Sequence, residues 1–213
     1  ILSIKGKVIP VTTNKVRLNM VLANEKLLQG EKEILLCEES LVGFRSLYLE
    51  PFPKADPHAI DEIMNADLIV FGPGGLYTSL IPNLLVEGVA KALRDTKAKK
   101  IFILNLVNKI KQTPDFKASD YIKEISRFVG TDIFDFILIN NRMPSAELVK
   151  KYSEEATLVE NDMLNDNRVI LADLIDENKP EYSKSDNLAH LRALIRHDSK
   201  KLSKQLMEIV ETL

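Results

Sequence analysis

Hydrophobic and polar residues alternate over much of the first fifty residues, with the period of two that is typical of half-buried β-strands. Gly30 to Lys32 and Thr12 to Asn14 are polar turns between such stretches. Four strands are predicted from this pattern, at Lys7–Val11, Val16–Val21, Glu33–Cys37 and Ser46–Leu49. We therefore expect residues 1–50 to form a β-rich segment within one domain that spans residues 1–213.

From Asp56 onward the pattern changes, and apolar stretches with helical spacing alternate with short, continuous apolar runs. Strands are predicted at residues 68–71, 101–106, 136–139 and 169–171. Helices are predicted at residues 56–65, 84–93, 119–130 and 145–153, and from Asp198 to the end, with Asp56, Ser119 and Asp198 as the expected N-caps. Such alternation predicts an α/β fold, with a Rossmann-like parallel sheet in three layers, crossover helices and a C-terminal packing helix. The polar residues 177–187 are expected to form a mobile loop.

A glycine-rich break follows the first predicted strand of this sheet. Glycines let a backbone approach a ligand closely, and the free N–H groups at the start of the next helix favour an anion. A tight turn with no ligand explains the same glycines equally well. The residues concerned are Gly72, Gly74 and Gly75, with Tyr77, Thr78 and Ser79 directly after them.

Two further strands also end in polar residues. Asn105 ends one strand and is followed by a polar loop that closes with Thr113, and Asn140 and Asn141 end the next strand. Ligands bind beyond the carboxyl ends of the strands in an open parallel sheet, so we expect the three ends to line one crevice. A turn is an equally good interpretation of the asparagine pair, because asparagine tolerates left-handed backbone angles.

Composition narrows the choice of partners. The formal net charge is −2 and the two signs are interleaved, which gives no reason to expect a nucleic-acid partner. No apolar run reaches the roughly 18 residues of a membrane helix, so no membrane insertion is expected. Cys37 is the single cysteine, and the histidines lack metal-ligand spacing, so we expect no disulfide, no metal site and a cytoplasmic location.

The run "ADLIVFGPGGLYTSLIPNLL", residues 66–85, closely resembles the signature of the gluconeogenesis factor family, which shares a superfamily with the CofD-like 2-phospho-L-lactate transferases. Residues 6–12 resemble its "GKVLPAT" stretch, Gly30–Glu31 its "GE" turn, and Arg196–Asp198 its "RHD" motif. The resemblance implies that the N-terminal part of the family domain, with a GGGTG phosphate loop, is missing from this chain. The family usually has serine at the position of Gly75.

The resemblance implies a cytoplasmic factor that binds a nucleotide sugar, with a UDP-sugar as its ligand, and that acts in carbon metabolism and cell-shape maintenance. We also expect the protein to form a homo-oligomer. The residues expected to bind the ligand are Gly72, Gly74, Gly75, Tyr77, Thr78, Ser79, Asn83, Asn105, Thr113, Asn140 and Asn141.

Two other functions stay open from the sequence. The first is a 2-phospho-L-lactate transferase-like enzyme that moves a phospholactyl group to a deazaflavin precursor. Asp120 is then the expected catalytic acid, and a divalent metal would neutralise the diphosphate. The second is a role in assembly alone, in a protein whose ligand site is degraded. The sheet edge or the final helix would then form the interface of an oligomer.

Overall fold

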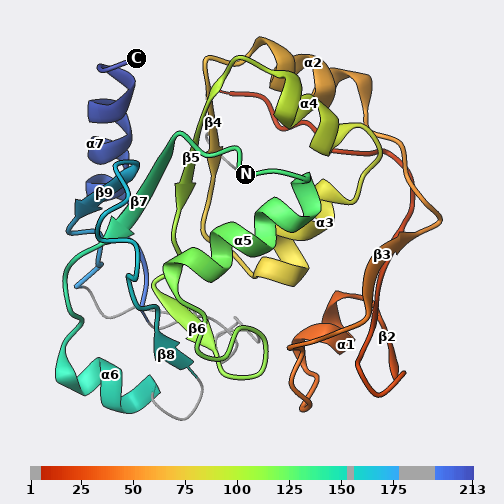
Figure 1. The fold of residues 1–213 in the computed structure, drawn as a ribbon, viewed down its shortest axis with the longest axis horizontal. Coiled ribbons are helices and arrows are strands. Elements are labelled where there is room, and N and C mark those ends of the chain that lie inside the picture. Colours follow the sequence, from red (N-terminus) through yellow and green to blue (C-terminus); the bar gives the residue numbers. More distant parts are fainter. Residues whose placement is uncertain (1–5, 153–155, 178–194) are drawn as a thin grey trace.

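A four-stranded parallel sheet forms the centre of the computed structural model, which describes residues 6–152, 156–177 and 195–213 (Figure 1). Its strand order is β4-β5-β7-β9, and every neighbouring pair is parallel. These strands are β4 (Leu68–Phe71), β5 (Lys99–Ile103), β7 (Phe136–Asn140) and β9 (Val169–Ala172). The predicted α/β class and all four predicted strands of this sheet are therefore confirmed.

One face of the sheet is covered by helix α5 (Ala118–Val129). Side chains alternate between the two faces of a strand. Phe102 and Ile137 point to the α5 face and lie in the same buried cluster as Tyr121 of that helix. The ring centroids of Phe102 and Tyr121 are 6.3 Å apart. These contacts fix α5 above the carboxyl half of the sheet.

The opposite face is covered by helix α7 (Ser199–Val210), which lies at the left of Figure 1. Ile101 and Leu138 form a second buried cluster there with Ile209 of α7. Asp198 caps the helix by accepting hydrogen bonds from the N–H groups of Lys200 and Lys201. The predicted packing helix and its N-cap are confirmed, and the core has three layers.

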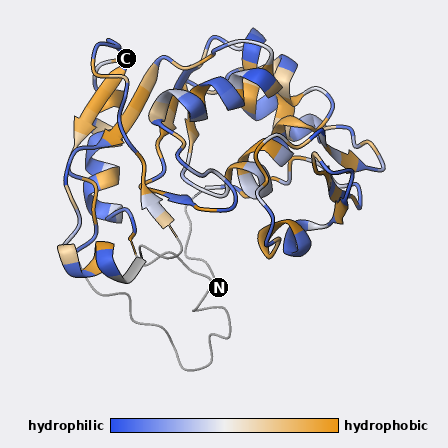
Figure 2. Ribbon diagram, turned by 60° about the horizontal axis from the view of Figure 1, so that its bottom comes forward, coloured by the Kyte–Doolittle hydropathy of each residue, from blue (hydrophilic) through white to orange (hydrophobic). Residues whose placement is uncertain are grey.

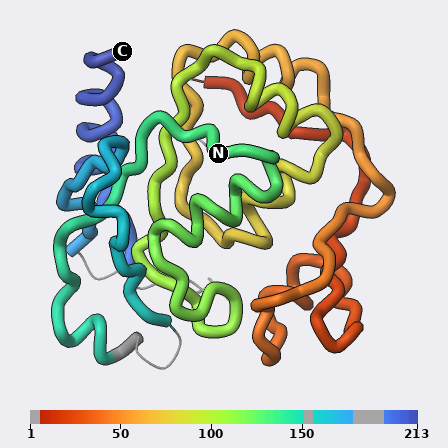
Figure 3. The backbone as a smooth tube through the Cα atoms, in the orientation of Figure 1, coloured from red at the N-terminus to blue at the C-terminus, as the bar shows by residue number. Residues whose placement is uncertain are grey.

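The N-terminal segment forms a separate antiparallel sheet with the order β2-β1-β3 (Figure 3). Its strands are β1 (Arg17–Val21), β2 (Leu27–Gln29) and β3 (Ser46–Glu50). The predictions for β1 and β3 are confirmed, whereas β2 was not predicted because Leu28 is its single buried residue.

Two predicted N-terminal strands are wrong. Residues 7–11 run extended but pair with no strand, and Asp56 donates its N–H to the Val11 carbonyl at 2.9 Å. Residues predicted as a strand at 33–37 instead belong largely to helix α1 (Glu31–Leu35). Gly30, with φ of +99°, turns the chain there, and the Glu33 carboxylate accepts from the Gln29 N–H at 2.8 Å. Alternating hydrophobicity over so few residues does not distinguish these cases.

Helix α2 (Pro57–Asn65) begins as predicted after its cap Asp56, whose carboxylate accepts from the His58 N–H at 2.9 Å. The single helix predicted at residues 84–93 is wrong. The chain forms two short helices, α3 (Ile81–Leu84) and α4 (Val89–Asp95). Gly88 separates them with φ of +102°, an angle that interrupts any right-handed helix.

Helix α5 ends at Gly130 with φ of +96°, as predicted, but the cap predicted at Ser119 is wrong, because the helix begins one residue earlier, after Lys117. The helix predicted at residues 145–153 is confirmed as α6 (Ala146–Tyr152). A small antiparallel pair, β6 (Val107–Lys109) and β8 (Ala156–Leu158), was not predicted. Most of the loop expected at residues 177–187 lies outside the described residues.

Hydrophobic residues dominate the strands of the central sheet, and the helices carry most of the hydrophilic ones (Figure 2). Among the parts of the chain that the structure describes, no helix has both the length and the apolar character needed to cross a membrane.

Candidate functional site

The glycine turn connects β4 to a π-helical turn, η1 (Leu76–Leu80), which continues directly into α3. Asn105, just after β5, holds this turn from both sides. Its Oδ1 accepts from the Gly74 N–H at 3.2 Å, and its Nδ2 donates to the Gly74 carbonyl at 2.9 Å. Asn105 therefore joins the ends of two neighbouring strands. Both the oxygen and the nitrogen of its side-chain amide are hydrogen-bonded to the backbone of Gly74.

Gly75 determines where the first hydroxyl of the turn lies. Its carbonyl accepts from the N–H groups of Ser79 at 2.8 Å and Leu80 at 3.1 Å. A Cβ atom at this position would clash with Oγ1 of Thr78. Glycine at this position therefore leaves space that the Thr78 hydroxyl occupies.

A cavity of about 550 Å³ opens between the glycine turn, the loop after β5 and the residues that precede α7. This volume lies within the range of pockets that bind small molecules, roughly 300–1,000 Å³. The polar and charged side chains that line it are Glu31, Thr78, Ser79, Asn105, Lys109, Gln112, Thr113, Arg196 and His197. Six residues of the predicted ligand-binding set line this cavity, namely Gly74, Gly75, Thr78, Ser79, Asn105 and Thr113.

A buried polar network lies beside Thr113. Oγ1 of Thr113 is 3.2 Å from the Tyr121 hydroxyl, which donates to Oδ1 of Asn108 at 2.8 Å. Asn108 in turn donates to the Phe116 carbonyl at 2.7 Å. Burial raises the pKa of Tyr121, so the phenol stays protonated and remains a donor. The network holds the loop of residues 108–116 against α5 and so shapes one wall of the cavity.

Asp120 does not line this cavity. Its carboxylate accepts from the Lys117 N–H at 3.0 Å and lies 3.5 Å from Nζ of Lys123. Both contacts stabilise the first turn of α5. No group of three or more His, Cys, Asp and Glu side chains that could hold a metal ion occurs within residues 6–152, 156–177 and 195–213.

The asparagine pair after β7 lines a neighbouring cavity of about 360 Å³, which shares Asn105 and Leu106 with the first one. Asn140 donates to the Arg142 carbonyl at 2.6 Å, and its Oδ1 accepts from the N–H groups of Arg142 and Leu174. Asn140 thus stabilises a turn, while Asn141 is exposed. The third strand end is adjacent to the crevice but does not share its main cavity.

Tyr77 and Asn83 lie away from the 550 Å³ cavity. Tyr77 is buried, packs edge-on against Phe44 at 5.1 Å and is hydrogen-bonded to Glu124. Burial raises the pKa of Tyr77. Nδ2 of Asn83 donates to the Ser79 carbonyl at 2.7 Å, inside its own helical segment. Both residues therefore stabilise the η1–α3 segment on the side away from the cavity.

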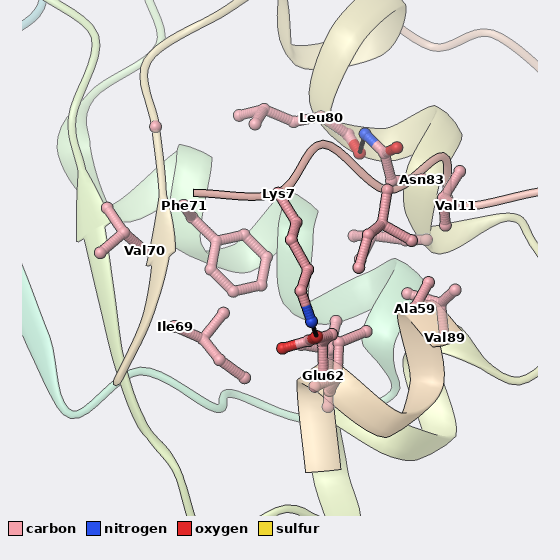
Figure 4. Close-up of a pocket in the computed structure, with 15 residues that line it drawn as sticks. Lys7, Val11, Ala59, Glu62, Ile69, Val70, Phe71, Leu80, Asn83 and Val89 are labelled. Carbon is pink, nitrogen blue, oxygen red and sulfur yellow. Dashed lines mark hydrogen bonds and ion pairs between the residues drawn. The ribbon is translucent and has the colours of Figure 1, made fainter. Parts of the chain in front are cut away.

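A larger cavity of about 630 Å³ lies between residues 7–11, α2 and β4 (Figure 4). Its lining is mainly aliphatic, and Gly72 and Asn83 belong to it. Lys7 and Glu62 form an ion pair across it, with Nζ and Oε1 3.6 Å apart. Because it lacks convergent polar groups, we take the smaller cavity beside the glycine turn as the candidate site.

Five polar or charged residues that line the candidate site were not predicted as ligand contacts, namely Glu31, Lys109, Gln112, Arg196 and His197. Burial lowers the pKa of His197 to about 4, and a hydrogen bond to the Leu104 carbonyl partly offsets this effect. The "RHD" motif was the available signal, but its distance in sequence from the glycine turn gave no reason to place it there.

The family model described as 2-phospho-L-lactate transferase CofD matches residues 1–179. The chain belongs to the CofD family. This match covers the glycine turn, Asn105 and the loop that ends with Thr113, so most of the candidate site lies in the part that defines the family.

Relatives within the CofD family carry the name gluconeogenesis factor. A Thermotoga maritima protein with that name is 37% identical over 95% of this chain, and a Listeria innocua protein is 33% identical over 99%. The chain covers 62% and 61% of these two proteins, about three fifths of their length. A crystal structure of a Bacillus halodurans protein of the UPF0052 family superposes with a TM-score of 0.80 at 27% identity, over 97% of this chain and 63% of the other.

Proposed function

We propose that this protein binds a nucleotide sugar, of the UDP-sugar type, in the 550 Å³ cavity at the carboxyl ends of β4 and β5. One observation carries the proposal. Asn105 holds the glycine turn in place, and the turn faces a wall that contains Arg196 across a cavity of suitable size. In a parallel α/β sheet, this is where nucleotide ligands bind.

The charges of the lining suit a diphosphate. Arg196 and Lys109 are cationic, the Thr78 and Ser79 hydroxyls donate hydrogen bonds, and Glu31 is the one acidic side chain of the lining. The first N–H groups of a helical segment have no acceptor within it, and they add a favourable dipole for an anion. The diphosphate would therefore lie between η1 and Arg196.

The names of the relatives support a wider role. We infer that the protein is a cytoplasmic factor of the gluconeogenesis-factor type, that it acts in carbon metabolism and cell-shape maintenance, and that it works as a homo-oligomer. The 2-phospho-L-lactate transferase reaction is the alternative that the family description suggests. We favour binding over that reaction because Asp120, the acid expected to catalyse it, caps α5 instead of facing the cavity.

A thermal-shift titration tests the proposal. UDP-N-acetylglucosamine at 100 times its dissociation constant should stabilise the protein by about 2.7 kcal/mol. We expect the same stabilisation with and without divalent metal. If UDP-sugars leave the melting temperature unchanged, or if the protein turns over a deazaflavin acceptor, binding as the principal function is wrong.

Gly74→Val tests the location of the site. A Cβ at Gly74 already contacts Ser79 at 3.4 Å, so the valine methyl groups would extend into the cavity. We expect ligand stabilisation to disappear while the ligand-free protein stays folded, as circular dichroism would show.

Gly72→Ala is the matched control, since Gly72 belongs to the same turn, lies outside this cavity and has open space around it. The control should bind as the unchanged protein does. Undiminished binding by Gly74→Val would place the ligand elsewhere.

A further inference from the structure

Two polar side chains that line the candidate cavity have hydrogen-bonding groups left unpaired among the described residues. Nε2 of His197 is buried and has no hydrogen-bond partner among the described residues. Gln112 is only 5% exposed, and its side-chain amide makes no hydrogen bond within the described part of the chain. Both residues line the 550 Å³ cavity. Buried polar groups are usually paired in folded proteins, so two unpaired ones in one cavity suggest a ligand.

The state of the His197 ring follows from its surroundings. Desolvation favours the neutral imidazole, whose pKa is lowered to about 4. The ring nitrogen Nε2 has no hydrogen-bond partner among the described residues. Nε2 can accept a hydrogen bond through a lone pair or donate one as an N–H, so it can pair with a polar group of a ligand.

The backbone holds His197 in this position. Residue 197 forms an antiparallel bridge with Ile175, and Arg196 accepts from the Asp176 N–H at 2.9 Å. The next residue, Asp198, is the N-cap of α7. These contacts fix the backbone of residues 196–198, so the position from which the His197 side chain projects is set before any ligand binds.

We propose that His197 and Gln112 bind an uncharged part of the ligand, with Nε2 of His197 hydrogen-bonded to a hydroxyl or to an imide group. This proposal rests on the proposed nucleotide-sugar function and names the residues that recognise its neutral part. Gln112 can donate and accept, so it completes the recognition of a group with adjacent donor and acceptor atoms. A sugar and a pyrimidine base both offer such a group.

Calorimetric titration of three ligands tests whether His197 and Gln112 bind the uncharged part of the ligand. Inorganic pyrophosphate has no neutral part, UDP adds the base, and UDP-N-acetylglucosamine adds the sugar. We expect His197→Phe and Gln112→Leu each to weaken binding of UDP-N-acetylglucosamine by about tenfold, the factor for a ligand donor or acceptor left unpaired. Pyrophosphate affinity should change less than about twofold. A loss that also appears with UDP assigns the contact to the base, and a loss confined to the sugar nucleotide assigns it to the sugar.

The His197→Gln variant and a spectroscopic measurement separate recognition from a structural role. Glutamine can supply an acceptor near the position of Nε2, so it should restore most of the affinity lost in His197→Phe. In the unchanged protein, the ¹⁵N resonance of Nε2 should shift when UDP-N-acetylglucosamine binds, because Nε2 becomes hydrogen-bonded.

The outcomes distinguish the two proposals. If the unchanged protein binds the nucleotide but neither variant weakens it, or if Nε2 does not respond, this inference is wrong and the proposed function stands. Equal losses for pyrophosphate and the sugar nucleotide would also overturn the inference. If the unchanged protein binds none of the three ligands, the proposed function fails and this inference fails with it.

Discussion

At the scale of single residues, several polar side chains that the sequence predicts as functional have structural roles. Asn105, Asn140 and Asp120 were predicted as ligand or catalytic residues, and each uses its side chain on nearby backbone groups. Gln112 and His197 were not predicted, yet both line the cavity, and Nε2 of His197 has no partner among the described residues. Sequence spacing places a residue at a strand end, but it does not show whether the side chain already has a partner.

Asn105→Ala should loosen the glycine turn. The Gly74 N–H and carbonyl would both lose their partner in a partly buried place, which costs about 1–3 kcal/mol in the free energy of unfolding. Urea unfolding of the ligand-free protein measures this. Asn141→Ala is the control, because Asn141 is exposed one strand further along, and it should change stability by less than about 0.5 kcal/mol. Equal effects of the two changes would contradict the role given to Asn105.

At the scale of elements, prediction succeeded where burial was continuous. The four strands of the central sheet are short apolar runs, and a buried parallel sheet needs such runs. The segments at residues 7–11 and 33–37 are only five residues long, and an extended segment or a short helix accommodates such a run equally well. β6 and β8 are three residues long, too short for any period to appear. Errors thus gather where tertiary contacts, not local pattern, decide the structure.

The boundary between α3 and α4 tests this explanation. Gly88→Ala should destabilise the protein by about 1–2 kcal/mol, because φ of +102° is unfavourable for a residue with a Cβ. The added Cβ meets Ile60 at 3.7 Å and Ala55 at 3.9 Å, so crowding contributes little. Gly72→Ala, without a positive φ, is the matched control and should stay within about 0.5 kcal/mol in the same urea titration. A neutral Gly88→Ala would mean that the two helices can merge as the sequence pattern predicted.

At the scale of the whole molecule, the candidate site is assembled from distant parts of the chain. Helix α1, the glycine turn, the loop after β5 and residues 195–197 all line the cavity. Parallel topology explains why the two strand ends meet, and that part was predicted. The contributions of α1 and of residues 195–197 depend on how the N-terminal sheet and the start of α7 pack against the core, which no local pattern specifies.

The same assembly predicts how stability depends on pH. Burial depresses the pKa of His197 to about 4, so the unfolded chain binds its proton more readily. The contribution of His197 to the free energy of unfolding is then complete above pH 6.5, the ordinary pKa of histidine. This contribution falls as the pH decreases toward 4. Arg142 and Lys201 hold the pKa of Asp173 at about 2, which ties β9 to the start of α7. That contribution is complete above pH 3.8 and is lost as the pH falls toward 2.

Urea unfolding at a series of pH values separates the two windows. Between pH 6.5 and 4, the protein should lose on the order of 2 kcal/mol through His197, after allowance for partial exposure of the ring. His197→Gln should remove this loss and leave the fall below pH 4 intact. Asp173→Asn should do the reverse, since it removes a carboxylate and keeps the imidazole. If His197→Gln retains the same pH dependence between 6.5 and 4, burial of the His197 ring is not the cause of that dependence.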